Sequence, residues 1–139
     1  MIVADTNVVS ELMRAEPSPA VRSWVLARGR DEVRITAITV AEVLYGIERL
    51  PDGRRKAALR DAASEVFDRF TEDVLPFDTA AAMVYPEIVS HRDRQGTPIS
   101  GYDAQIASIC RARDARLATR NVKDFAGVGI ALVDPWATG

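Results

Sequence analysis

Short apolar runs alternate along the chain with segments in which apolar residues recur at helical spacing. The first run, Met1-Ile2-Val3-Ala4, leads directly into Asp5-Thr6-Asn7 and an amphipathic segment. We predict a strand that ends at the carboxylate of Asp5, followed by a helix that Thr6 or Asn7 caps. Apolar runs predict further strands over residues 33–36, 74–77, 116–119 and 130–133.

Helical spacing is clearest from Arg54 to about Glu72, where apolar residues recur every three or four positions. Other helices are predicted after Asp5, over residues 21–28, from Thr39 to residue 50, from Thr79 to about Arg94 with a kink at Pro86, from Ser100 to residue 110, and as a single turn at 121–124. Strands that alternate with helices in this way predict an α/β fold, in which a mainly parallel sheet carries helices on both faces.

The composition is that of a globular protein. The chain has 139 residues, of which 47% are hydrophobic and 27% charged, and its length suits one domain over residues 1–139. Apolar runs stay well below the roughly 18 residues that a membrane helix needs, so we expect no membrane association. The N-terminus lacks the basic region and the long apolar stretch of a signal peptide. We therefore expect a cytoplasmic protein.

The sequence lacks the residues for cysteine-based sites and for a histidine-based catalytic triad. Cys110 is the only cysteine, which excludes a disulfide within the chain and a cysteine-based zinc site. His91, the only histidine, stands in a charged run and is expected at the solvated surface rather than in a catalytic triad. A bound metal would therefore take oxygen ligands. The 16 arginines against 2 lysines suit phosphate binding, although GC-rich coding explains the same bias.

Acidic residues recur at one kind of position. Three of them follow a possible helix cap by three residues: Glu42 after Thr39, Asp103 after Ser100 and Asp124 after Asn121. A capping residue followed by an acid at this distance is the capping box, and the helix dipole favours negative charge there. Each acid taken singly is therefore explained by its helix.

The expected fold gives these acids a common location. Strands of a parallel sheet end at the same edge, so Asp5, Glu42, Asp103 and Asp124 are predicted to converge there. Carboxylates gathered without a counter-ion repel one another. Oxygen ligands completed by water select Mg²⁺ or Mn²⁺, and such ions support hydrolysis of phosphodiesters.

The residues that carry a family resemblance extend over nearly the whole chain. They are Asp5-Thr6-Asn7 with Ser10 and Glu11, Ile38-Thr39-Val40-Ala41-Glu42, Gly96 through Ile99, Asp103-Ala104-Gln105-Ile106-Ala107, Ala118-Thr119-Arg120-Asn121, Asp124-Phe125 and Val133-Asp134-Pro135-Trp136. In this order the set resembles PIN-domain proteins, and most of all the VapC and FitB toxins. The resemblance implies a three-layer α/β/α nuclease that cleaves RNA with Mg²⁺ or Mn²⁺, forms homodimers and is held inactive by an antitoxin protein.

The resemblance also implies roles for individual residues. Asp5, Glu42 and Asp103 match the acidic triad of the family, and Asp5 and Asp103 are the foremost metal ligands. Relatives often carry aspartate where this chain has Asn121, so either Asn121 or Asp124 is expected to complete the site. The polar neighbours with expected supporting roles are Thr6, Asn7 and Thr119, which would orient ligands or a phosphate, and Arg120, which would contact phosphate. Helix capping by Thr6 or Asn7 and a surface ion pair of Arg120 are the alternatives.

Two other functions fit parts of the pattern. The same fold would serve as a binding module if the acids act only as caps and the apolar helices bind a partner. An aspartate after the first strand also occurs in receivers and in haloacid dehalogenase phosphatases. Position 7 is asparagine where the phosphatases have a second aspartate, and no acidic pair precedes Asp5 as receivers require. A metal-dependent ribonuclease is therefore the favoured function.

Overall fold

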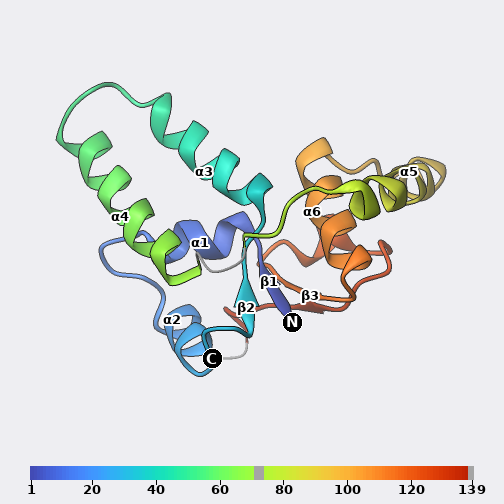
Figure 1. The fold of residues 1–139 in the computed structure, drawn as a ribbon, viewed down its shortest axis with the longest axis horizontal. Helices are drawn as coiled ribbons and strands as arrows, with labels where there is room; N and C mark the ends of the chain where they lie inside the picture. The colour runs from blue at the N-terminus through green and yellow to red at the C-terminus, as the bar shows by residue number, and fades with distance from the viewer. Residues whose placement is uncertain (71–73, 138–139) are drawn as a thin grey trace.

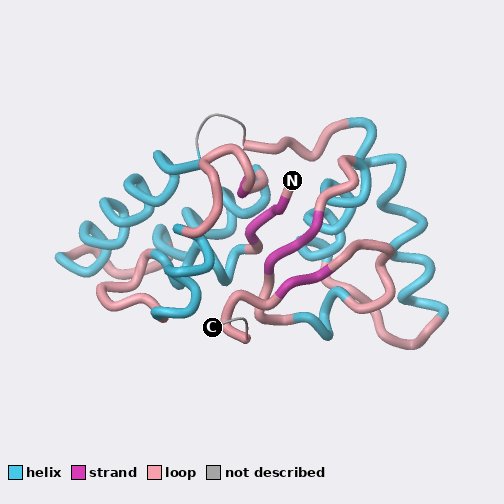
Figure 2. Tube along the Cα trace, turned by 90° about the horizontal axis from the view of Figure 1, so that it is seen from below, coloured by secondary structure: helices cyan, strands magenta, loops and turns pink. Residues whose placement is uncertain are grey.

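A parallel sheet lies at the centre of the computed structural model, which describes residues 1–70 and 74–137 (Figure 2). Within these ranges the strands are β1 (Ile2–Ala4), β2 (Val33–Arg34), β3 (Arg116–Ala118) and β4 (Leu132–Val133), in the spatial order β2-β1-β3-β4. All neighbouring strands are parallel, and Ile2 pairs with Val33 on one side and Arg116 on the other. The predicted parallel sheet is confirmed.

Helices cover both faces of this sheet (Figure 1). One layer holds α1 (Thr6–Leu12), α2 (Pro19–Leu26), α3 (Ala37–Glu48) and α4 (Arg54–Phe70), and the other holds α5 (Thr79–Arg94), α6 (Gly101–Ala112) and the 3₁₀ helix η2 (Val122–Phe125). Because successive side chains of a strand point to opposite faces, Ile2 and Ala4 pack in the first layer and Val3 in the second. The predicted three-layer α/β/α architecture is thus confirmed.

Several strands are shorter than predicted. The strand expected over residues 74–77 is reduced to a single bridge between Leu75 and Thr36, because Pro76 has no backbone N–H with which to extend the pairing. The strand expected over residues 33–36 ends at Arg34, and the last strand begins at Leu132 rather than at residue 130. The predicted end of the fourth helix at about Glu72 lies outside the described residues, and α5 continues through Pro86.

Two helices are capped by residues other than those predicted. Thr36, not Thr39, caps α3 by accepting a hydrogen bond from the Thr39 backbone at 3.1 Å. Glu42 therefore lies in the second turn of α3, where a capping box has no place for it. At α1 the cap is Asp5 itself, which accepts from the Thr6 backbone at 2.8 Å, rather than Thr6 or Asn7. Asn121 makes no side-chain cap hydrogen bond to η2.

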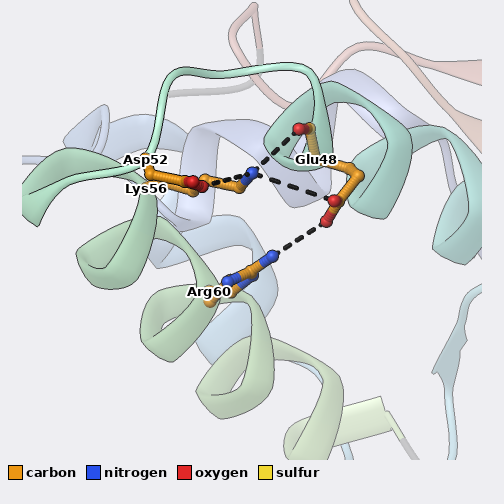
Figure 3. Close-up of polar contacts among 4 residues, drawn as sticks. All are labelled: Glu48, Asp52, Lys56 and Arg60. Atoms are coloured by element: carbon orange, nitrogen blue, oxygen red, sulfur yellow. Dashed lines mark hydrogen bonds and ion pairs between the residues drawn. The ribbon is translucent and has the colours of Figure 1, made fainter.

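A buried lysine joins α3 to α4 (Figure 3). The side chain of Lys56 is only 7% exposed, and its ammonium donates to the Glu48 carbonyl at 3.0 Å and to Asp52 Oδ1 at 3.2 Å. Arg60 donates to Glu48 Oε2 at 2.8 Å from the next turn of α4. These contacts fix the angle at which α4 returns along α3, and α3 carries Glu42.

Replacing this ammonium is expected to weaken the fold. Lys56→Met should lower the free energy of unfolding by about 1–3 kcal/mol, because the Glu48 carbonyl and Asp52 lose a charged donor. Arg60→Gln is the matched control, since both partners of its ion pair are exposed and such pairs contribute about 0.5 kcal/mol. Urea unfolding of the two variants measures the difference. Equal losses would contradict a special role for Lys56.

Among the described helices, none has both the length and the apolar composition of a bilayer-spanning segment.

Candidate active site

The first acid lies where the central strand ends. Asp5 follows β1 directly, and its backbone N–H donates to the Ala118 carbonyl at 2.9 Å, which holds it beside the end of β3. Glu42 reaches the same edge from α3, and Asp103 reaches it from the first turn of α6. All three line one pocket of about 580 Å³. Its lining residues are Asp5, Thr6, Asn7, Ser10, Glu11, Arg14, Glu42, Asp103, Arg120, Asn121 and Trp136.

Asp5 is held on both oxygens. Oδ1 accepts from the Thr6 backbone at 2.8 Å, and Oδ2 accepts from the buried Thr119 hydroxyl, also at 2.8 Å. Thr119 Oγ1 in turn accepts from Asn7 Nδ2 at 3.2 Å and from the Asn121 backbone at 3.0 Å. Because each partner is itself fixed, the carboxylate of Asp5 has one orientation in the pocket.

Burial changes the acidity of Asp5. The side chain is only 5% exposed, and desolvation raises its pKa from the ordinary value of 3.8 to about 6. The hydrogen bonds from Thr119 and Thr6 act in the opposite direction, whereas the charges of Asp103 and Glu42 raise the pKa further. The carboxylates thus affect one another electrostatically across the pocket.

The other two acids show the same pattern. Burial raises the pKa of Glu42, the hydrogen bond from the Thr6 hydroxyl at 2.8 Å lowers it, and the charge of Asp103 raises it. For Asp103, burial again raises the pKa first, the Ser100 cap lowers it, the charge of Asp124 raises it and that of Arg92 lowers it. The pocket therefore disfavours the full set of negative charges that neutral pH would give it.

This donor set has the chemistry of a site for a hard divalent cation. It offers carboxylate oxygens from three separate elements and the amide group of Asn121, and Mg²⁺ and Mn²⁺ bind such oxygens together with water. A cation would offset the cost of burying charged carboxylates, which is the main cause of the raised pKa values, and would also relieve their mutual repulsion. As the described side chains are placed, no three of their Asp, Glu, His or Cys groups are close enough to hold an ion jointly.

The structure separates the two candidates for the fourth position. Asn121 lines the pocket, whereas Asp124 is exposed and is not among the lining residues. Asp124 influences Asp103 through its charge. Its backbone carbonyl accepts from Arg92 Nη1 at 2.7 Å, and Arg92 Nε donates to the Thr97 carbonyl at 2.6 Å. Arg92 thereby ties η2 to the loop that precedes α6.

Sequence reasoning gave no site role to Glu11 or Trp136, although both line the pocket. Glu11 is buried in the pocket wall, where it pairs with Arg14 at 3.1 Å and accepts from the Ser18 backbone at 3.2 Å. Trp136 lines the pocket from beyond β4. The sequence held a signal for Glu11, because it stands one helical turn after Asn7 and so shares a face of α1 with it.

The role of Arg92 was also missed. It stands in a charged run that resembles any solvated helix end, so its burial could not be predicted from the sequence. His91 beside it is exposed, as predicted.

Comparison with known proteins identifies the family of this chain. A profile described as PIN domain matches residues 2–130. The chain belongs to the PIN-domain family. Two relatives of this PIN domain are similar over nearly their whole length. VapC ribonuclease Y4jK of Sinorhizobium fredii is 36% identical over 98% of both chains. Toxin FitB of Neisseria gonorrhoeae is 33% identical over 98% of this chain and 99% of FitB.

Solved structures agree with this PIN-domain assignment. The crystal structure of FitAcB from Neisseria gonorrhoeae matches with a TM-score of 0.89, at 33% identity, over 98% of this chain and 99% of that one. A toxin–antitoxin complex from Klebsiella pneumoniae, 22% identical, has the same fold with a TM-score of 0.71 over 97% and 98% of the two chains. The resemblance to PIN-domain proteins that the sequence motifs indicated is thus confirmed.

Proposed function

We propose that this PIN domain is the toxin of a type II toxin–antitoxin pair, an endoribonuclease that hydrolyses RNA phosphodiester bonds with Mg²⁺ or Mn²⁺. The observation that carries the proposal is the pocket that Asp5, Glu42 and Asp103 line together, each with a raised pKa. The names of the relatives, a VapC ribonuclease and a FitB toxin, support the reaction and its biological setting.

Each residue of the pocket has a proposed role in this reaction. Asp5 and Asp103 would hold the cation, and Glu42 would act through a bound water, because no three of the described acids are close enough to hold an ion jointly. When bound, the cation lowers the pKa of an attacking water and stabilises the departing 3′ oxygen. Thr119 and Thr6 keep Asp5 and Glu42 oriented through hydroxyl hydrogen bonds of 2.8 Å each. Asn121 adds a neutral group, Asp124 acts on Asp103 through its charge, and Arg120 contacts the RNA backbone.

A protein antitoxin is the proposed partner. The relative from Klebsiella pneumoniae was solved as a toxin–antitoxin complex. We propose a homodimer as well, and the exposed apolar side chains of this chain support it: Leu44 is 46% exposed, Tyr45 65% and Met83 77%. Light scattering of the purified chain measures its mass in solution. The mass of a single chain at all concentrations would contradict the dimer.

An RNA cleavage assay tests the proposed reaction. The purified chain is incubated with a long single-stranded transcript and Mn²⁺, with and without EDTA, and we expect cleavage only where the metal is free. Asp61→Asn, which removes an exposed acid on α4, is the matched control and should cleave like the parent. Intact RNA in both conditions, from a folded chain, would favour the binding module instead.

Metal addition is also expected to stabilise the fold. A cation that binds only the folded pocket raises the free energy of unfolding by roughly 2–3 kcal/mol at about a hundred times its dissociation constant. The melting temperature should therefore rise with Mg²⁺ or Mn²⁺ and return with EDTA. Asp103→Asn should lose most of this rise, while Asp61→Asn should keep it. An equal rise in both variants would place the cation outside the pocket.

A further inference from the structure

The side chains of Arg120 and Trp136 lie together at the pocket rim, and the proposed mechanism gives them no joint role. The guanidinium carbon of Arg120 lies 5.2 Å from the centre of the Trp136 ring, within the range of a cation–π contact. Both side chains line the pocket that Asp5, Glu42 and Asp103 share. An arginine and an aromatic ring therefore stand together beside the acids.

The ring of Trp136 is a fixed surface. The Trp136 backbone donates to Asp134 Oδ1 at 2.9 Å, and the half-buried ring packs against the core on the α1–α4 side of the sheet. The strand before it is anchored too, since the Thr119 backbone donates to the Val133 carbonyl at 2.9 Å. A ring held in this way restricts the side chain that lies on it.

The backbone of Arg120 belongs to the network that orients Asp5. Its N–H donates to Asn7 Oδ1 at 3.4 Å, and its neighbour Thr119 donates to Asp5. Arg14, the other cation of the pocket, is occupied by Glu11. Among the ion pairs found within residues 1–70 and 74–137, none involves Arg120. Its guanidinium is therefore the pocket cation available to a phosphate.

A freely moving arginine beside three carboxylates would be drawn onto them by charge and would compete with a bound cation. Stacking on Trp136 holds the guanidinium at the rim instead, and an arm fixed beforehand loses less conformational entropy when it binds. RNA needs such a cation, because its phosphates are repelled by the acids they must approach. We propose that Trp136 positions Arg120 to bind the RNA phosphate next to the bond that is cut. This inference rests on the proposed ribonuclease function.

Substitution kinetics on the transcript, with Mn²⁺ present, test the inference. Arg120→Gln should raise KM by about tenfold, the effect of losing one charge-assisted contact, with kcat nearly unchanged. The slope of log affinity against log salt should fall by about one. The matched control is Arg116→Gln, which removes an exposed arginine at the opposite end of β3 and should change neither quantity.

The role of Trp136 follows from a double-mutant cycle. Trp136→Leu should raise KM as Arg120→Gln does, Trp136→Phe should restore most of the affinity, and Trp136→Leu should add little when Arg120→Gln is already present. Full additivity of the two changes would overturn the positioning role. If the parent is active and Arg120→Gln has the same KM as Arg116→Gln, the inference is overturned while the proposed function stands. A folded parent that neither binds nor cuts RNA would overturn the proposed function with it.

Fluorescence decides the question if Trp136→Leu does not fold. In a Trp24→Phe chain the emission comes from Trp136, the other of the two tryptophans. Short single-stranded RNA of random sequence is added with EDTA present, and the anisotropy of a label on the RNA measures its binding. This binding should change the emission of Trp136. Arg120→Gln should remove the change. RNA binding that leaves the emission of Trp136 unaltered would overturn the inference.

Discussion

Asp5→Asn is expected to reduce RNA cleavage by about a thousandfold or more, which corresponds to roughly 4 kcal/mol of transition-state stabilisation. The substitution keeps the size of the side chain and one carbonyl oxygen, yet it removes the negative charge at the centre of the pocket. That charge is the part of the residue that a divalent cation needs. Initial cleavage rates on the transcript with Mn²⁺ measure the loss.

The control for this result is the exposed acid Asp61 on α4, which lies outside the pocket lining. Asp61→Asn should leave the rate unchanged, and far-ultraviolet circular dichroism should show equal helix content in both variants and the parent. Cleavage by Asp5→Asn at the parent rate would remove Asp5 from the proposed metal site. The same loss in Asp61→Asn would point to a general effect of charge rather than to the pocket.

The same substitution should make the metal-free protein more stable at neutral pH. The pKa of Asp5 is raised from 3.8 to about 6, which corresponds to a destabilisation of up to about 3 kcal/mol when the carboxylate is charged in the folded chain. The neutral amide in Asp5→Asn avoids this cost but is a weaker acceptor for the Thr119 hydroxyl, at a loss of about 1 kcal/mol. We therefore expect a net gain of roughly 2 kcal/mol in the free energy of unfolding.

The gain should depend on pH in a defined direction. A raised pKa means that the folded state keeps a proton that the unfolded chain releases. The stability from this group is therefore complete below about pH 4 and is lost as pH rises through about 6. The difference between Asp5→Asn and the parent should thus be small or negative near pH 4 and level off above about pH 7. Urea unfolding in EDTA at several pH values measures it, and a difference independent of pH would contradict the buried carboxylate.

The position of Asp5 could be predicted because two local patterns agree. An apolar run of strand length ends at the carboxylate, and strands separated by helical segments predict a parallel sheet with one functional edge. The helix from Arg54 was equally clear, since its apolar residues keep helical spacing over several turns. Periodicity is a local property, so the sequence reveals it without any knowledge of tertiary contacts.

Other features depend on contacts that local patterns do not contain. Thr36 and Thr39 are both able to cap a helix, and the bridge from Thr36 to Leu75 favours the earlier start. Arg92 reads as one charge in a solvated run, yet it is buried by partners from η2 and from the loop before α6. The choice between Asn121 and Asp124 likewise depends on how η2 turns away from the edge of the sheet.

The strand order also governs when the pocket can form during translation. Asp5 directly follows β1, but its partner Thr119 lies 114 positions later. β1 stands between β2 and β3, so one side of it has no neighbour until Arg116–Ala118 has left the ribosome. A nascent fragment that ends before β3 carries Asp5 without the neighbouring strand and without the Thr119 hydroxyl that orients it. The pocket therefore cannot form during translation until β3 has left the ribosome.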